Sequence, residues 1–562
     1  MKPLPLLGAA VFALAACSAP LVVTQAPTPV PAPANAPAPA ANGAGEPTIV
    51  PRATVDTPPS DWQLLDELND HLPGISVLRA EQTLLAGKQP KQTVLVAVID
   101  GGLDTAHVDL LPHLWHNPKE IAGNGVDDDH NGYVDDTWGW NFIGGPGGKD
   151  INNETLEITR LYSRCNHIAA LSVAGPPIPA EECAEITKLF PLKRDSAKAE
   201  LANIENAGSA LDRATQILTA AMHDSLTTAS VSAYGPSNQL EQQAKAIWLQ
   251  LDRLHITKSV IDDALQDVKS QVDFGYDTLY DPRPKIVGDD LMNLNQRDYG
   301  NRDVMGPDAL HGSHVSGIIG AVPDPKEGTQ GIAQSVRIMM IRTVPDGDER
   351  DKDVANAIRY AVDNGAKVIN MSFGKPYSPQ KADVDAAVKY ADAHGVLMVH
   401  AAGNDGHDND TGGNFPTAYY LDGGKAVNWI EVGASSWKGG DTLATTFSNY
   451  GKQRVDVFAP GQAILSTVPH NEFKREDGTS MASPVVTGLA ALIMSYYPNL
   501  SATDVKDIIL QSATRYAGQM VAKPGSEKGA PLVPFGSLSV TGGIVNAYAA
   551  LELAAERSAA KP

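Results

Sequence analysis

Apolar residues follow two different periods along the second half of the chain. Short runs that are almost entirely apolar predict buried strands, and stretches with apolar residues at helical spacing predict helices between them. The predicted strands are 93–99, 336–344, 368–371 and 396–400, and the predicted helices are 354–364 and 384–393. Strands that alternate with helices in this way are typical of a parallel sheet covered by helices on both faces. The pattern therefore predicts an α/β fold.

The segment 150–275 has a different character. It is rich in Ala, Leu, Glu and Lys, and its apolar residues recur every three or four positions. One apolar stripe runs from Leu201 to Ala221 and a second from Leu240 to Val272, with a loop at 227–238 between them. We expect this segment to be an α-helical hairpin inserted into the α/β fold.

The N-terminal part has the composition of a targeting segment and a tether. Residues 1–17 combine Lys2 with a short apolar run, which is typical of a secretory signal peptide. Residues 18–60 are rich in Pro and Ala, so they cannot bury a core and should form an extended tether. The α/β domain is then expected in two parts, 61–149 with an acidic loop and 276–556, on either side of the insertion.

The charge of the chain excludes one class of partner. The 562 residues carry a net charge of −22 at pH 7. Binding of nucleic acid requires a basic surface, so this balance argues against a nucleic-acid partner. A high net charge is instead consistent with keeping an exported protein soluble.

Three polar motifs stand where predicted elements begin or end. Asp100 follows the first predicted strand, at the carboxyl end where α/β sheets place their sites. His311 opens the sequence His-Gly-Ser-His-Val-Ser-Gly, which indicates the start of a helix. Ser480 lies in Gly-Thr-Ser-Met-Ala-Ser-Pro before an apolar helix, where unpaired N–H groups favour an anion and Pro484 is compatible with a first turn. These are the groups of nucleophilic catalysis, although Ser480 viewed alone is more readily interpreted as a helix cap.

In the order Asp, His, Ser, these motifs resemble those of the subtilase family of serine endopeptidases. The resemblance implies a three-layer α/β/α fold with a mostly parallel sheet, peptide or protein substrates, and an acyl-enzyme mechanism. In that mechanism Ser480 is the nucleophile, His311 the base and Asp100 the group that orients the imidazole. The resemblance also implies that Asn404 donates a hydrogen bond to the oxyanion and that Ser372, Phe373 and Gly374 pair with the substrate main chain. It further places Asn414 near the specificity pocket. The family usually has Ser or Thr where this chain has Gly101, which removes a hydroxyl that could orient Asp100.

Two other functions fit the same sequence. Within enzymes, the alternative is a limited-specificity processing protease. Outside them, it is a non-catalytic anchored scaffold that binds a protein partner through the helical insertion, although a scaffold has no need of the triad. The acidic run at 346–353 is interpreted as a solvated loop, or else as a rim that favours basic peptides.

An acidic loop precedes the insertion. Its residues Asp127, Asp129, Asn131 and Asp135 alternate around a glycine turn, as in the first half of a calcium-binding loop. The match ends at Trp138, which occupies the place of the bidentate glutamate. Oxygen ligands favour calcium over zinc, so the loop predicts calcium as a cofactor, with an ion-free solvated turn as the alternative.

The chain has three cysteines. Cys17 ends the sequence Leu-Ala-Ala-Cys, which resembles the bacterial lipoprotein processing box. It predicts acylation of Cys17 and anchoring to the bacterial outer membrane, on its periplasmic or its cell-surface face. The alternative is an ordinary signal peptide that contains a cysteine. Cys165 and Cys183 are then expected to form a disulfide in an exported protein, the alternative being two buried thiols.

Overall fold

The computed structural model describes residues 51–53, 57–168, 177–254, 256–324 and 326–561. The predictions for the signal peptide, for most of the tether and for Cys17 fall outside these described residues. The described chain forms two compact units. The first extends to Leu192 and resumes at Asp273, and the second is Lys193–Val272.

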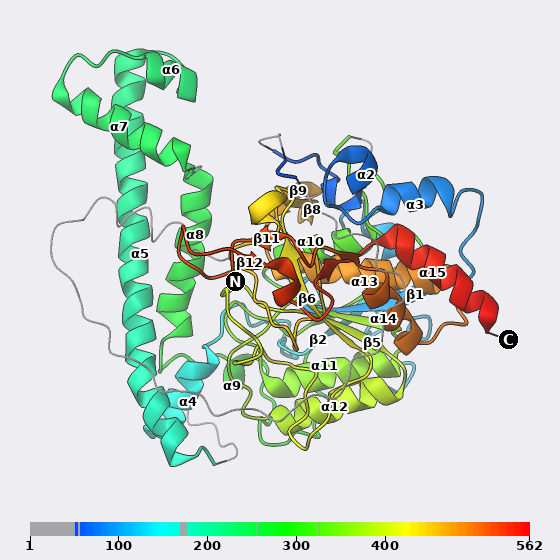
Figure 1. Cartoon of the computed structure of the whole chain (residues 1–562). Helices are drawn as coiled ribbons and strands as arrows, with labels where there is room; N and C mark the ends of the chain where they lie inside the picture. The colour runs from blue at the N-terminus through cyan, green and yellow to red at the C-terminus, as the bar shows by residue number, and fades with distance from the viewer. Residues whose placement is uncertain (1–50, 54–56, 169–176, 255, 325, 562) are drawn as a thin grey trace. The chain divides into compact units, whose positions relative to one another are not determined.

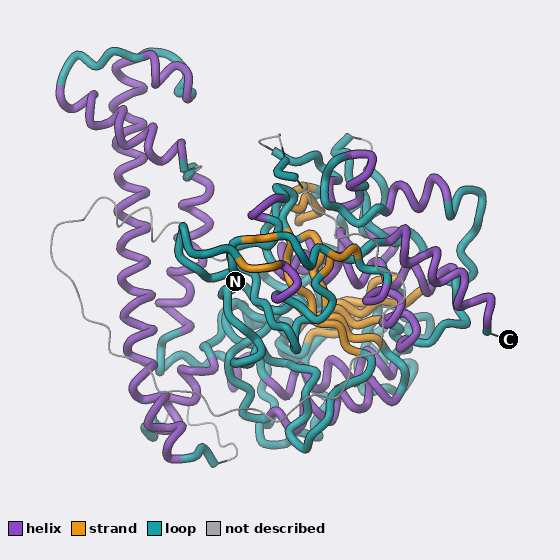
Figure 2. Tube along the Cα trace, viewed as in Figure 1, coloured by secondary structure: helices purple, strands orange, loops and turns teal. Residues whose placement is uncertain are grey.

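The first unit is built on a nine-stranded sheet in the order β10-β13-β7-β6-β5-β4-β1-β3-β2 (Figure 2). All neighbouring strands are parallel except β10 and β13. Its strands are β1 (Val94–Asp100), β2 (Gly139–Asn141), β3 (Val336–Arg342), β4 (Val368–Met371), β5 (Leu397–Ala401), β6 (Trp429–Ser435), β7 (Val457–Pro460), β10 (Thr514–Arg515) and β13 (Gly543–Ile544). The predicted mostly parallel sheet is therefore confirmed. Two small antiparallel pairs accompany it, β8 (Ile464–Val468) with β9 (Glu472–Glu476) and β11 (Met520–Val521) with β12 (Val533–Pro534).

Helices cover both faces of this sheet. Alternate residues of β1 belong to different cores, because side chains along a strand point to opposite faces. Val96 and Val98 share one core with α10 (Leu310–Gly320), α13 (Thr479–Tyr496), α14 (Ala502–Gln511) and α15 (Ala547–Ala560). Ala97 and Ile99 share the other with α11 (Asp351–Asp363) and α12 (Lys381–Ala393). Figure 1 shows the strands between these two helical layers, which confirms the three-layer α/β/α fold.

One helix combines the length and hydropathy of a membrane span. Among the described residues, α13 alone meets this criterion, over its 18 residues. However, 89% of that window is buried inside the protein. Its apolar character is therefore that of a central core helix packed against α10 and five strands of the sheet.

The second unit consists of helices. The described helices that contribute to it are α5 (Ala180–Met222), α6 (Thr228–Ala233), α7 (Gln239–Arg253) and α8 (Lys258–Ser270). Apolar residues of α5 such as Ile204 and Leu211 pack with Leu251, Ile261 and Val268 of α7 and α8. The inserted helical hairpin is thus confirmed, with two refinements. The loop expected at 227–238 contains the short helix α6, and the second arm is divided into α7 and α8.

The helical unit begins later than the predicted insertion of 150–275. The described residues of 150–192 belong to the same compact unit as the sheet. They include α4 (Glu157–Cys165), whose Glu157 and Arg160 are almost completely buried. Composition alone does not reveal this packing, because charged residues on a helix usually face solvent. α4 is joined to the start of α5 by the disulfide Cys165–Cys183, so the pairing expected of the two cysteines is present.

Candidate active site

Three of the predicted site positions lie at the carboxyl ends of neighbouring strands. Asp100 ends β1, Ser372 follows β4 and Asn404 follows β5, and the order β5-β4-β1 places these strands side by side. All three strands are parallel, so their carboxyl ends meet at one edge of the sheet. This edge is where ligands of open α/β sheets bind.

Asp100 and His311 are in direct contact. The Nδ1 atom of His311 lies 2.8 Å from Oδ1 and 3.0 Å from Oδ2 of Asp100. His311 is in the first turn of α10, and a side chain added at Gly312 would collide with the carbonyl oxygen of Gly102 at 2.1 Å. Glycine at 312 therefore lets α10 approach the end of β1 closely enough for this contact.

Asp100 is oriented without the hydroxyl that the family usually supplies. The backbone N–H of Gly101 donates to Oδ1 of Asp100 at 2.7 Å, and the carboxylate is buried. The second histidine of the motif, His314, has a different environment. Its Nε2 lies 3.0 Å from the carbonyl oxygens of Ile464 and Lys474, and burial lowers its pKa to about 4. A neutral, buried imidazole of this kind is a packing residue and not a catalytic base.

Ser480 is the second residue of α13, and it is tied to Ser372 by two hydrogen bonds. The Ser480 hydroxyl donates to the carbonyl oxygen of Ser372 at 3.0 Å, and the Ser372 hydroxyl donates to the carbonyl oxygen of Ser480 at 2.9 Å. The second bond is possible because of Pro484. Proline has no N–H, so the Ser480 carbonyl has no partner one helical turn further on.

Pro484 is therefore not a first-turn residue, as the sequence had suggested. It is the sixth residue of α13. Asn370 of β4 completes the connection, because its amide donates to the Ser372 hydroxyl at 2.9 Å. The side-chain Oδ1 of Asn370 accepts from the hydroxyls of Ser483 and Thr487 on α13, at 3.0 Å and 2.9 Å. Sequence reasoning missed Asn370, whose only signal is a polar residue in an otherwise apolar buried strand.

Asn404 is held by Thr479, another residue that the sequence did not single out. The Oδ1 atom of Asn404 accepts from the backbone N–H and from the hydroxyl of Thr479, both at 2.9 Å. A backbone N–H can only donate, so this contact fixes which end of the amide is oxygen. The Nδ2 group is therefore the donor end. Thr479 precedes Ser480, so the amide of Asn404 is anchored at the start of the helix that carries the serine.

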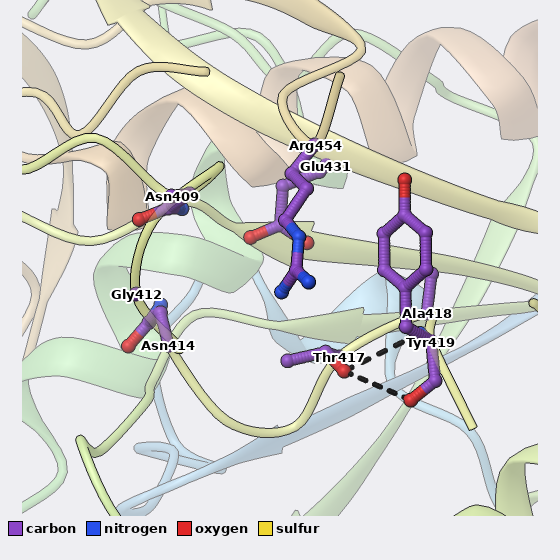
Figure 3. Close-up of a pocket in the computed structure, with 8 residues that line it drawn as sticks. All are labelled: Asn409, Gly412, Asn414, Thr417, Ala418, Tyr419, Glu431 and Arg454. Atoms are coloured by element: carbon purple, nitrogen blue, oxygen red, sulfur yellow. Dashed lines mark hydrogen bonds between the residues drawn. The ribbon is translucent and has the colours of Figure 1, made fainter. Parts of the chain in front are cut away.

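The stretch Ser372–Gly374 continues into a short antiparallel contact. Lys375 and Phe415 exchange two backbone hydrogen bonds, at 3.1 Å and 2.9 Å. The neighbouring Asn414 donates to the carbonyl oxygen of Ala401 at 3.0 Å, and its side chain lies against Gly374. Asn414 also lines a small pocket together with Glu431, Arg454, Tyr419, Asn409, Gly412, Thr417 and Ala418 (Figure 3). Figure 3 shows the guanidinium of Arg454 extending into this pocket.

The acidic run is neither a solvated loop nor an exposed rim over 348–353, although its first acidic residue, Asp346, is exposed. Asp348, Glu349, Asp351 and Asp353 are all buried. Lys375 is the cation at the centre of a buried ion network with these acidic residues. Its Nζ lies 2.9 Å from Glu157, 2.9 Å from Asp351 and 2.7 Å from the carbonyl oxygen of Glu349. The charges therefore face inward and tie the end of the stretch Ser372–Gly374 to α4.

The acidic loop places three carboxylates together, and one of them was not predicted. Oxygen atoms of Glu120, Asp127 and Asp129 lie within 4.8 Å of one another. Glu120 is buried, and its Oε1 accepts from the backbone N–H groups of Asp128 and Asp129 at 2.9 Å and 3.2 Å. Its Oε2 is buried without a hydrogen-bond partner among the described residues. A buried carboxylate oxygen with no donor has the character of a cation ligand.

Asp135 and Asn131 have other partners in this loop. The carboxylate of Asp135 accepts from three backbone N–H groups at 123–125 and from Arg302 at 2.8 Å. The side-chain oxygen of Asn131 accepts from the backbone N–H of Tyr133 at 2.8 Å. The alternating sequence pattern thus identified Asp127 and Asp129 of the cluster, whereas Glu120 replaces Asp135 in it.

The profile of the subtilase family matches residues 91–526. The thermophilic serine proteinase of Bacillus sp. (strain AK1) is 35% identical over 291 residues, which cover 51% of this chain and 62% of that protein. Subtilisin DY of Bacillus licheniformis is 37% identical over 205 residues, covering 36% and 70%. Thermitase of Thermoactinomyces vulgaris is 37% identical over 209 residues, covering 37% and 68%. The family match extends over most of the unit that carries Asp100, His311 and Ser480, and the chain belongs to the subtilase family of serine endopeptidases.

Proposed function

We propose that this chain is an exported, membrane-anchored serine endopeptidase that cleaves peptide bonds through an acyl-enzyme, with Asp100, His311 and Ser480 as its triad. The observation that carries the proposal is the 2.8 Å contact between Nδ1 of His311 and the buried carboxylate of Asp100. A carboxylate only accepts, so the proton of a neutral His311 resides on Nδ1, and Nε2 is left as a base.

The proposed reaction begins with a change of partner at Ser480. The Ser480 hydroxyl leaves the carbonyl oxygen of Ser372 and donates to Nε2 of His311 as the oxygen attacks the substrate carbonyl. His311 takes the proton and returns it to the leaving amine, and water then hydrolyses the acyl-enzyme by the same route. The developing oxyanion is met by the Nδ2 group of Asn404 and by the backbone N–H of Ser480, which the helix cannot pair.

The triad is tested by labelling and by turnover. Ser480→Ala should abolish labelling by a fluorophosphonate and lower kcat by a factor on the order of 10⁶, the loss known for the same change in subtilisin. Ser495→Ala is the matched control, because Ser495 is a buried serine on the same helix whose hydroxyl donates to the carbonyl oxygen of Leu492 within α13. It should label normally. Labelling of Ser480→Ala at the wild-type level would refute the assignment.

Asn404 is tested separately from the triad. Asn404→Ala removes one proposed oxyanion donor, and loss of one such donor lowers kcat by roughly 10²–10³. KM should change little, because the interaction forms mainly in the transition state. An Asn404→Ala enzyme with wild-type kcat would show that the amide has no part in the reaction.

Export and anchoring are proposed from the sequence of residues 1–17. The proposal has the mature protein beginning at an acylated Cys17 and held at the outer membrane, where the compartment permits the disulfide Cys165–Cys183. Cys17→Ser should release the protein from membranes and abolish incorporation of labelled palmitate. A Cys17→Ser protein that stays in the membrane fraction would contradict the anchor.

We propose in addition that the acidic loop binds calcium through Glu120, Asp127 and Asp129. The proposal is supported by the buried, unpartnered Oε2 of Glu120, for which a cation would compensate. If calcium binds the loop in the folded state and not in the unfolded state, excess chelator should lower the unfolding temperature of wild type. Glu120→Gln should make this decrease in unfolding temperature smaller. Asp135→Asn is the informative comparison, because Asp135 is satisfied by backbone N–H groups and Arg302. Identical melting curves with chelator and with millimolar calcium would refute the site.

A further inference from the structure

A fully buried histidine lies beside the stretch Ser372–Gly374. His400 is on β5 and has no exposed surface, and both of its ring nitrogens face acceptors. Nδ1 lies 3.0 Å and 3.1 Å from the two carboxylate oxygens of Glu431, and Nε2 lies 2.9 Å from the carbonyl oxygen of Phe373. A carbonyl oxygen can only accept, so Nε2 carries a proton and donates it to Phe373.

The contact between His400 and Phe373 lies just beyond the end of the hydrogen-bond ladder of the sheet. The ladder between β4 and β5 ends at the pair Met371 and His400. Beyond it, the main chain of Phe373 pairs with no strand among the described residues, and the His400 side chain takes the place of the next ladder bond. In an extended chain the polar groups of successive residues point to opposite sides. A Phe373 carbonyl fixed toward His400 therefore turns the polar groups of Ser372 and Gly374 to the other side.

Glu431 keeps His400 in the state that donates. It is the cross-strand neighbour of His400 on β6, and its Oε2 also accepts from the indole N–H of Trp429 at 2.9 Å. Burial raises the pKa of Glu431. Whether the shared proton lies on Glu431 or on Nδ1 of His400, Nε2 keeps its own proton. The carboxyl group thus fixes the tautomer as well as the orientation of the ring.

We propose that His400 and Glu431 are positioning residues for the peptide substrate. They hold the carbonyl of Phe373, and through it they present the main-chain edge of Ser372 and Gly374 to an extended peptide. The inference rests on the proposed endopeptidase function and extends it to residues that do not touch the reacting atoms. Main-chain pairing to this edge contributes equally to the ground state and the transition state, so its loss should raise KM and leave kcat nearly unchanged.

The test compares two substrates in three variants. The double variant His400→Leu with Glu431→Leu removes both polar partners together, which avoids leaving a buried charge unpaired. Its kcat/KM for a peptide of six or more residues should fall on the order of 10- to 100-fold through KM. Hydrolysis of a small ester such as p-nitrophenyl acetate and titration by fluorophosphonate should stay within about threefold, because they need no main-chain pairing.

Glu431→Gln and Glu431→Leu distinguish positioning from packing. The Gln amide can donate to Nδ1 and accept from Trp429, so His400 remains a donor at Nε2, and peptide kcat/KM should stay within about threefold of wild type. Glu431→Leu alone should show the KM increase of the double variant. Wild-type peptide kinetics in the double variant would overturn the proposal, and so would an equal loss with peptide and ester.

Failure of the proposed function would be seen differently in the same experiment. A wild-type protein that neither reacts with fluorophosphonate nor cleaves the ester lacks the triad chemistry, and it would overturn the endopeptidase function and the positioning role together. A wild-type protein that does both while the double variant binds peptide normally overturns the positioning role alone.

Discussion

Lys375 offers a direct test of the buried ion network, through the substitution Lys375→Met. Methionine keeps most of the apolar stem and removes the charge. The Lys375 side chain is 2% exposed, and its Nζ bonds Glu157, Asp351 and the carbonyl oxygen of Glu349. After the substitution Glu157 keeps Arg160 at 2.6 Å, whereas the partner that the Asp351 carboxylate keeps among the described residues is the backbone N–H of Gln380 at 2.8 Å.

The expected loss of stability follows from the buried carboxylate charge that Lys375→Met leaves unpaired. Removing one partner of a buried ion pair leaves a charge without compensation and destabilises by about 3–5 kcal/mol. For a domain of this size that corresponds to a decrease of roughly 6–10 °C in Tm, at about 2 °C for each kcal/mol. The matched control is Lys389→Met. Lys389 pairs with Asp422 at the surface, where the two side chains are 42% and 69% exposed and solvent screens the charges, so its loss should have little effect on stability.

The assay is urea denaturation followed by circular dichroism, with both variants made in a Ser480→Ala background to prevent self-cleavage. The free energy of unfolding of Lys375→Met should lie several kcal/mol below that of Lys389→Met. If the two differ by less than about 1 kcal/mol, desolvation of the charges offsets their attraction, and the network contributes nothing net to stability.

Three further predictions concern other parts of the molecule. Burial raises the pKa of Glu349 to about 7, so the folded state binds a proton that the unfolded chain releases, and stability should fall as pH rises from about 4.5 through 7. Glu349→Gln should therefore stabilise the protein at pH 8 by up to about 3 kcal/mol and have little effect at pH 4, and a gain independent of pH would contradict this account. Thr479→Ala removes one of the two hydrogen bonds that Thr479 donates to Asn404, so kcat should fall by up to about tenfold, less than in Asn404→Ala. Replacing 193–272 with a Gly/Ser linker should leave a folded enzyme, because the rings of Phe190 and Tyr276 lie 6.0 Å apart across the cut. Replacing 153–270 should abolish folding, because it removes Glu157 and Arg160, and equal solubility and ester hydrolysis in the two deletions would refute this boundary.

The sequence predicted those features that depend on local pattern. β1 is a run of β-branched residues buried on both faces, and a carboxylate after such a run lies at the end of a strand. The 3–4 repeat of 201–272 predicted the helical hairpin for the same reason, since one apolar face must be buried against another. The motifs of Asp100, His311 and Ser480 carry their own helix and strand boundaries, so their local structure could be inferred as well.

The sequence could not predict features that depend on pairing across the fold. The acidic residues at 346–353 have the same composition whether water or a buried cation compensates them, and Lys375 and Glu157 are separated by 218 positions. In the acidic loop, Glu120 precedes the alternating residues, so a linear pattern omitted it and included Asp135. The boundary at 150 was placed too early because the charged face of α4 looks solvated until its partners are known.

The position of Pro484 in α13 was predicted wrongly, and its actual position explains how the site is organised. Interpreted as a first-turn proline, it explains nothing beyond the start of α13. As the sixth residue it frees the Ser480 carbonyl, and the Ser372 hydroxyl occupies the vacancy at 2.9 Å. Successive residues of the stretch after β4 are then held by different elements, Ser372 by α13, Phe373 by β5 and Lys375 by α4. A segment fixed from three sides has little freedom to adjust, so under the proposed function a bound peptide would adopt the extended form that this edge presents.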